Sequence, residues 1–198
     1  MQKVMVFIDF ENFNIALVNY YSSLGKPSPR IDYRIMPNEL IKKLPVVGYV
    51  DKTVLCAPKP DDFLIKIESK KRTYNWINGL KNIDYYTVIE GEHIARPVSG
   101  FTKDMMTPDN PASYYVVEKG TDINMTTEIV SKAFLNAYDT AVVISGDSDY
   151  IPVYKLLNII GKGSVAVGIE GQNLNRIKPY VDQVIIINND FISMCIRA

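Results

Sequence analysis

Residues 140–150 read TAVVISGDSDY, and this stretch decides the fold class. Its first half is continuously apolar or β-branched, which is typical of a strand buried on both faces of a parallel sheet. A polar turn with Asp147 and Asp149 follows, and helical periodicity begins directly after it, over 150–160. A further strand is predicted at 164–169, so the stretch indicates a strand–helix–strand unit of an α/β protein.

The same alternation extends outward to both ends of the chain. The other predicted strands lie at 4–8, 46–56, 83–89 and 184–187. The other predicted helices lie at 13–21, 61–80, 121–138 and 174–180. This pattern favours a central, mostly parallel sheet flanked by helices. Because crossovers between parallel strands are right-handed, the C-terminal ends of the strands are expected along one edge.

Residues 91–117 interrupt this alternation. The segment contains Pro97, Pro108 and Pro111, and proline removes a backbone donor and fixes its own φ angle. We expect an irregular or hairpin insertion here. No internal repeat, linker or low-complexity segment divides the sequence, so we expect a single domain over residues 1–198.

Composition excludes several functional classes. Lys and Arg number 22, as do Asp and Glu, so the formal net charge is zero and no general attraction to nucleic acid or anionic lipid is expected. Cys56 and Cys195 are too few and too far apart for a disulfide framework or a paired zinc motif. His93 is the only histidine, and a surface or structural role is expected for it. No segment has the ~20 apolar residues of a membrane span, so we expect a cytoplasmic protein without membrane association.

Four aspartates fall at the C-terminal ends of predicted strands or at the helix starts behind them. Asp9 ends the first strand, and Asp122 begins a helix after a lysine–glycine turn. Asp147 and Asp149 follow the strand at 140–145. Open α/β sheets bind ligands at this edge, and clustered carboxylates repel one another unless a cation neutralises them. Donors that are all oxygen atoms favour Mg²⁺ or Mn²⁺ over zinc.

Each aspartate also has a purely structural interpretation. A helix N-cap, which stabilises by roughly 1 kcal/mol, fits Asp122 and Asp149, and a turn fits Asp147. Capping needs only one of the two neighbouring acids Asp147 and Asp149, however. Asp9 is also an acid at the end of a wholly apolar strand. Taken together, the four acids favour a metal site.

Three motifs carry a resemblance to a known family. They read DFEN at 9–12, KGTD at 119–122 and SGDSDY at 145–150. In this order and in this strand–helix context, the chain resembles the NYN domain, and within it the LabA-like branch of the PIN-like nucleases, over residues 3–170. The resemblance implies a three-layer, Rossmann-type PIN-like fold. It also implies an acidic metal pocket at the C-terminal edge of the sheet and hydrolysis of RNA phosphodiester bonds.

The resemblance also implies roles for individual residues. The metal-site acids of the family match Asp9, Asp122, Asp147 and Asp149. The first three would be the principal ligands, and Asp149 would be a further ligand or would orient metal-bound water. Asn12 matches a supporting polar residue one helical turn after the first acid. One or two Mg²⁺ or Mn²⁺ ions would then activate water for attack on the phosphate, leaving a 5′-phosphate and a 3′-hydroxyl.

Three further residues near these motifs have two interpretations each. Ser148 would hold waters or ligands behind the metal site, or simply belong to the turn. Lys119 would contact a substrate phosphate or pair with an acid of the pocket, or be an ordinary surface lysine. Glu128 occupies the place of a second helix acid in the family. It lies six residues past Asp122, about 120° around an ideal helix, so metal binding and a solvated position both stay open.

A basic cluster on the predicted helix at 61–80 is a candidate RNA-binding surface. Its members are Lys66, Lys70, Lys71 and Arg72, with Trp76 close behind. Lysines four residues apart share a helix face and can follow phosphates, and an exposed tryptophan can stack on an unpaired base. Glu68 interrupts the run, so a solvated helix face with Trp76 packed on the core is the competing interpretation.

The sequence therefore predicts a Mg²⁺- or Mn²⁺-dependent ribonuclease acting on RNA, expected to be single-stranded. A catalytically weak or inactive RNA-binding or partner-docking module of the same fold is the alternative. A phosphohydrolase with an aspartyl nucleophile would need an Asp-x-Asp pair, whereas Asp9 and Glu11 form Asp-x-Glu. Homo-oligomerisation and a protein partner both stay open.

Overall fold

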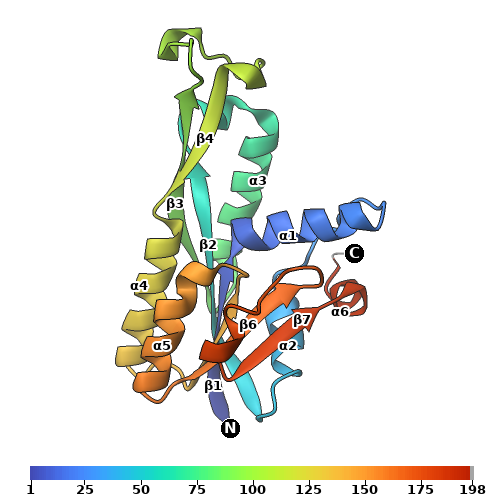
Figure 1. The fold of residues 1–198 in the computed structure, drawn as a ribbon, viewed down its shortest axis with the longest axis vertical. Coiled ribbons are helices and arrows are strands. Elements are labelled where there is room, and N and C mark those ends of the chain that lie inside the picture. Colours follow the sequence, from blue (N-terminus) through green and yellow to red (C-terminus); the bar gives the residue numbers. More distant parts are fainter. Residues whose placement is uncertain (197–198) are drawn as a thin grey trace.

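The computed structural model describes residues 1–196. Within that part of the chain, seven strands form one sheet in the order β4-β3-β2-β1-β5-β6-β7 (Figure 1). The strands are β1 (Gln2–Asp9), β2 (Gly48–Pro60), β3 (Tyr86–Pro97), β4 (Tyr114–Lys119), β5 (Thr140–Ile144), β6 (Gly163–Ile169) and β7 (Gln183–Ile187). Neighbouring strands pair in parallel except β3 and β4, which are antiparallel. This confirms the predicted α/β fold with a mostly parallel sheet.

Helices cover both faces of the sheet (Figure 1). They are α1 (Phe10–Ser23), α2 (Met36–Ile41), α3 (Glu68–Gly79), α4 (Thr121–Phe134), α5 (Ile151–Ile159) and α6 (Asn189–Met194). The buried residues of α1, α2, α3 and α6 belong to one hydrophobic cluster, and those of α4 and α5 belong to a second. The result is the three-layer arrangement of a PIN-like, Rossmann-type fold. No helix of the described residues is both long and apolar enough to cross a membrane.

The central strand β1 divides its side chains between the two clusters. Val4, Val6 and Ile8 enter the first cluster, whereas Met5 and Phe7 enter the second. Side chains alternate across a strand, so a strand buried on both faces must be apolar at every position. This explains the continuous apolar run in the sequence. Asp9, the last residue of this central strand, therefore lies at the centre of the C-terminal edge of the sheet.

The region predicted as one helix over 61–80 is divided. Strand β2 continues to Pro60, a short 3₁₀ turn occupies Leu64–Lys66, and α3 begins only at Glu68. The residue before α3, Ile67, is extended, with φ −78° and ψ 114°. This extended residue separates the turn from the helix.

The carboxylate of Asp61 holds the start of the 3₁₀ turn. It accepts backbone N–H bonds from Phe63 and Leu64 at 3.1 and 2.8 Å, and from Ala95 of β3 at 2.9 Å. Side-chain acceptance of this kind satisfies the first donors of a turn and competes with a continuous helix. Because one bond reaches β3, the turn is also fastened to the sheet.

The prediction near the C-terminus was also inexact, and two short helices were missed. The helix expected at 174–180 is a 3₁₀ turn at Lys178–Tyr180, and α2 and α6 were not predicted. Both missed helices have six residues, which is too short for helical periodicity to stand out.

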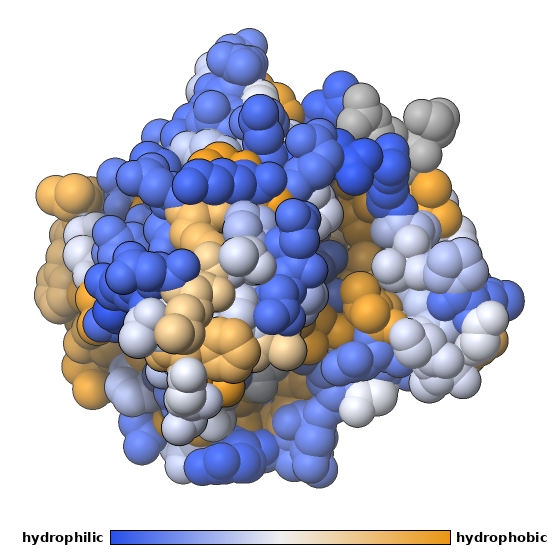
Figure 2. Space-filling view, turned by 90° about the horizontal axis from the view of Figure 1, so that it is seen from above, coloured by the Kyte–Doolittle hydropathy of each residue, from blue (hydrophilic) through white to orange (hydrophobic). Residues whose placement is uncertain are grey.

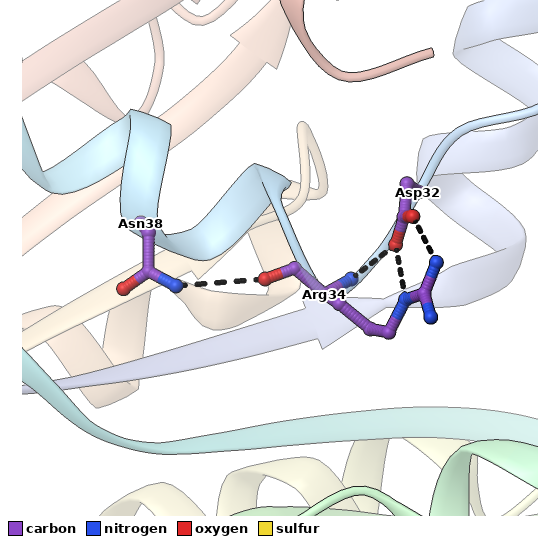
Figure 3. Close-up of polar contacts among 3 residues, drawn as sticks. All are labelled: Asp32, Arg34 and Asn38. Atoms are coloured by element: carbon purple, nitrogen blue, oxygen red, sulfur yellow. Dashed lines mark hydrogen bonds and ion pairs between the residues drawn. The ribbon is translucent and has the colours of Figure 1, made fainter. Parts of the chain in front are cut away.

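The chain before α2 is fixed by a local network around Asp32 (Figure 3). Its carboxylate accepts from the backbone nitrogen and from Nε of Arg34, each at 2.9 Å. The Nδ2 atom of Asn38 in turn lies 3.5 Å from the carbonyl oxygen of Arg34. These contacts set the start of α2, whose Met36 and Leu40 enter the core.

Strands β3 and β4 form a long hairpin that extends away from the rest of the sheet (Figure 1). Gly120 follows β4 with a left-handed φ of 81°, and α4 begins at the next residue, which returns the chain to the sheet edge. The start of α4 also lies very close to β3. A Cβ atom on Gly91 would be 2.1 Å from Oγ1 of Thr121, so only glycine permits this approach.

Candidate functional site

A cleft opens at the C-terminal ends of β1 and β5. These two strands are neighbours, but the chain continues from β1 toward β2 on one side and from β5 toward β6 on the other. Such a switch point is where open α/β sheets bind ligands. The cleft has a volume of about 360 Å³ and is lined by Asp9, Glu11, Asn12, Ile15, Lys70, His93, Val116, Glu118, Asp122 and Asp147. The molecule seen from above is largely hydrophilic, with hydrophobic patches between the polar side chains (Figure 2).

Asp9 lies at the base of the cleft and is 4% exposed. One carboxylate oxygen caps α1 by accepting from the backbone nitrogen of Asn12 at 3.2 Å, and the other accepts from Oγ of Ser145 at 3.0 Å. Burial raises the pKa of Asp9 to about 6, against the effect of these hydrogen bonds. The charges of Asp122 and Asp147 also raise this pKa. The site is therefore short of positive charge.

Asp122 is brought to Asp9 by a shared neighbour, Tyr150. The Tyr150 hydroxyl lies 3.1 Å from Oδ1 of Asp122 and 3.5 Å from Oδ2 of Asp9. Burial, followed by the two carboxylates, raises the pKa of this phenol, so it stays protonated and acts as a donor. The two carboxylates therefore lie on either side of one buried hydroxyl.

Asp147 follows β5 and also lines the cleft. Its backbone nitrogen lies 3.2 Å from Oγ of Ser145, the same hydroxyl that contacts Asp9. Its carboxylate accepts from the backbone nitrogen of Asp149 at 2.9 Å. The side chain of Asp149 is exposed and does not line the cleft, so its role stays a prediction.

Asn12 connects three segments around the cleft. Its Oδ1 accepts from the backbone nitrogen of Gly146 at 2.9 Å and from Nε2 of Gln172 at 3.4 Å. It thereby joins α1 to the turn after β5 and to the segment after β6. A neighbouring cavity of about 460 Å³ shares Asn12 and Ile15 with the cleft.

The other supporting residues predicted from the motifs lie outside the cleft lining. Lys119 is exposed at the end of β4, and Ser148 is partly exposed in the turn after β5. Glu128 forms an ion pair with Lys132, with 3.3 Å between Oε1 and Nζ. Their contributions to a metal or substrate site stay predictions.

The basic cluster contributes one residue to the cleft, Lys70. Lys66 and Lys71 are exposed, and the Nε atom of Arg72 lies 3.7 Å from a Glu68 carboxylate oxygen on the same helix. Trp76 packs with two aromatic side chains, at ring-centroid distances of 6.0 Å from Phe10 and 5.4 Å from Tyr33. These contacts place the indole against the hydrophobic core.

The sequence interpretation missed a second group of residues in the cleft. Nε2 of His93 lies 2.8 Å from Oε2 of Glu11, and Glu118 adds a second carboxylate. One donor atom from each of the three residues lies within 4.8 Å of the others. His93 is buried, not at the surface. Glu11 belongs to the first motif. His93 and Glu118 are brought opposite each other only by the β3–β4 pairing, which no sequence motif indicates.

The two carboxyl groups of this cluster share one electrostatic environment. Burial and the adjacent Glu11 raise the pKa of Glu118. Burial also acts to raise the pKa of Glu11, but hydrogen bonds with His93 and Glu118 outweigh this effect, so the pKa of Glu11 is lowered. Lys70 adds a favourable positive charge nearby. The charge of each carboxyl group therefore depends on the other and on His93.

The layered sheet and its carboxylate-lined switch point are those of a PIN-like α/β protein. The family model of the NYN domain matches residues 3–188, which is nearly the whole chain. The chain therefore belongs to the NYN domain family, which places it in the PIN-like nuclease superfamily and confirms the resemblance to the NYN domain seen in the motifs. The LabA-like branch stays a prediction.

The structural comparison agrees with this fold. A crystal structure of a protein of unknown function from Vibrio parahaemolyticus matches with a TM-score of 0.58 and 15% sequence identity. The match covers 96% of this chain and 96% of the other. At this identity the match supports the shared fold alone. The search of curated proteins found no match.

Proposed function

We propose that this protein is a Mg²⁺- or Mn²⁺-dependent ribonuclease of the LabA-like branch, acting as a single domain in the cytoplasm. The observation that supports this most directly is the convergence of Asp9, Asp122 and Asp147 from three distant segments on one cleft. Of the described residues that line the cleft, Lys70 is the only lysine or arginine. Carboxylates in this number repel one another, and a divalent cation would reverse the charge of the pocket.

The donor chemistry fits a hard divalent ion. The aspartates offer only oxygen atoms, which suit Mg²⁺ and Mn²⁺, and one or two ions are consistent with this set. The pKa of Asp9 is raised mainly by burial and further by the charges of Asp122 and Asp147, and a bound cation would counter both effects. When bound, a divalent ion would polarise the phosphate and make a coordinated water more acidic.

The chain's own residues would hold the ligands in place. Ser145 and Tyr150 donate to the aspartates, and Asn12 fixes the turn after β5. Such outer contacts orient metal ligands and sustain affinity. Lys70, at the cleft, would contact a substrate phosphate. Asp149, in the turn directly after Asp147, would orient the attacking water.

An RNA strand without base pairing fits the surface next to the cleft. The adjoining cavity offers side chains that suit a nucleobase, namely Asn19, Tyr20 and Gln172. Amides can hydrogen-bond to base edges, and tyrosine rings can stack on exposed bases. Of the described residues that line this cavity, none is a lysine or arginine, so we assign it to a base and not to the phosphate backbone.

The test is cleavage of a fluorescent single-stranded RNA with Mn²⁺, Mg²⁺ or EDTA. We expect metal-dependent cleavage in the unmodified protein and at least a hundredfold loss in Asp147→Asn. The control is Asp109→Asn, which removes a charge from an exposed residue of the hairpin tip. Full activity in Asp147→Asn would refute the assignment. RNA binding and a Mn²⁺-induced thermal shift without cleavage would favour the inactive binding module.

A further inference from the structure

Glu11, His93 and Glu118 form a group that has no role in the reaction proposed for the aspartates. They come from α1, β3 and β4, so each is positioned by a different element. One donor atom of each lies within 4.8 Å of the others. Ligands at ~2.0–2.2 Å from an ion are ~3–4 Å apart, so side-chain rotation alone is sufficient to bring these donors to an ion.

The imidazole distinguishes this group from the aspartates. His93 is 8% exposed, and its Nε2 is directed at Glu11, 2.8 Å from Oε2. Mg²⁺ has little preference for imidazole nitrogen, whereas Zn²⁺ and other transition metals bind it well together with carboxylates. A set of one nitrogen and two carboxylates therefore selects a different class of ion from that of the all-oxygen site.

The backbone holds the group in register. His93 and Glu118 are directly opposite each other across the antiparallel β3–β4 pair. Gly91 fixes the approach of β3 to the start of α4, just after Glu118. All three side chains line the cleft, so an ion from solvent can reach them.

We propose that Glu11, His93 and Glu118 form a second cation site, separate from the three aspartates, that takes a transition metal such as Zn²⁺. Three protein ligands leave one coordination position of a tetrahedral ion open. The three ligands line the same cleft as the aspartates. This proposal does not depend on RNA cleavage.

The experiment uses the full chain without a polyhistidine tag. Because His93 is the only histidine, its imidazole resonances report on this site alone. Zn²⁺ is titrated in the presence of excess Mg²⁺, which occupies the aspartates, and ¹⁵N NMR follows the ring. We expect a saturable shift of Nε2 at one equivalent of Zn²⁺. An unchanged ring spectrum at saturating Zn²⁺ would overturn the proposal.

Variants and Co²⁺ absorption provide the second measurement. Four- or five-coordinate Co²⁺ bound to protein side chains gives visible bands much stronger than those of the hydrated ion. We expect the apparent Co²⁺ affinity measured from these bands to fall at least tenfold in His93→Asn and Glu118→Gln. Asp147→Asn should retain them, as should Glu92→Gln, an exposed neighbour of His93 in the same strand. Circular dichroism of the metal-free variants verifies folding. Equal Co²⁺ binding in all four variants would contradict the site. Loss confined to Asp147→Asn would assign the ion to the aspartates instead.

Discussion

At the scale of single residues, Asp9 illustrates a conflict between stability and function. Its pKa is about 6 in the folded protein, above the ordinary value of 3.8. The folded state therefore binds more protons than the unfolded state between about pH 4 and 6. The contribution of Asp9 to the unfolding free energy is most favourable below pH 4 and is lost as the pH rises through 6.

This predicts that Asp9→Asn stabilises the metal-free protein at neutral pH. The asparagine removes the buried charge and can still accept one hydrogen bond, so we expect a gain of about 1–3 kcal/mol at pH 7.5 and almost none at pH 4. Urea unfolding in EDTA at both pH values measures the difference. A gain of equal size at the two pH values would show that burial of the charge is not the cause.

Tyr150 and Tyr154 form a matched pair for testing a buried hydroxyl. The Tyr150 hydroxyl contacts both Asp9 and Asp122, whereas the Tyr154 hydroxyl is buried without a hydrogen-bond partner among the described residues. We expect Tyr150→Phe to lower metal affinity or cleavage about 10–100-fold, because it removes a donor behind the ligands. Tyr154→Phe should retain full activity. Titration of Mn²⁺ against the initial rate distinguishes the two, and equal rates would contradict the role of Tyr150.

At the scale of elements, the turn before α3 depends on one carboxylate. Asp61 accepts three backbone N–H bonds, one of them from β3. We expect Asp61→Ala to lower the unfolding free energy by about 2 kcal/mol, since it removes a cap and leaves donors unsatisfied. The adjacent Asp62 is exposed, so Asp62→Ala is the control. Chemical denaturation compares the two, and equal stabilities would refute the capping role.

The approach of β3 to α4 gives a second prediction at this scale. In Gly91→Ala, the new Cβ would meet Oγ1 of Thr121 at 2.1 Å and the carbonyl oxygen of Lys119 at 2.8 Å. The start of α4 must then move, and Asp122 moves with it. We expect at least a tenfold loss of cleavage, with reduced stability. Gly79→Ala in α3 meets no atom within 4 Å and should be neutral or stabilising by up to about 1 kcal/mol. Unchanged kinetics in Gly91→Ala would contradict this coupling.

At the scale of the whole molecule, local patterns predicted the layers and the aspartate cleft. The apolar strands indicated the sheet, and the meeting of Asp9 and Asp147 followed from parallel strand ends that share one edge. Asp122 was recognised from its motif and its helix start, and the structure places it after the antiparallel strand β4. What failed depended on tertiary contacts. In the region predicted as one helix over 61–80, Asp61 instead accepts a hydrogen bond from the backbone nitrogen of Ala95 in another strand. A pattern within one segment cannot contain such information.

The second cluster was missed for a similar reason. His93 and Glu118 are 25 positions apart in the sequence, and only the hairpin register places them opposite each other. The length and pairing of a hairpin with a long connection are not encoded by a two-residue turn motif. The sequence therefore predicted that Asp9, Asp122 and Asp147 gather at one cleft, but not that Glu11, His93 and Glu118 do.

The connection at the hairpin tip can be exchanged without altering the residues that line the cleft. Residues 98–113 connect β3 to β4, and Ser113 holds the connection locally by donating to the carbonyl oxygen of Asn110 at 2.7 Å. The residues that line the cleft all lie outside this connection. Segments of this kind tolerate insertion and exchange. New recognition loops could therefore be grafted onto the distal end of the ribbon, giving variants that choose different substrates while the reaction centre stays the same.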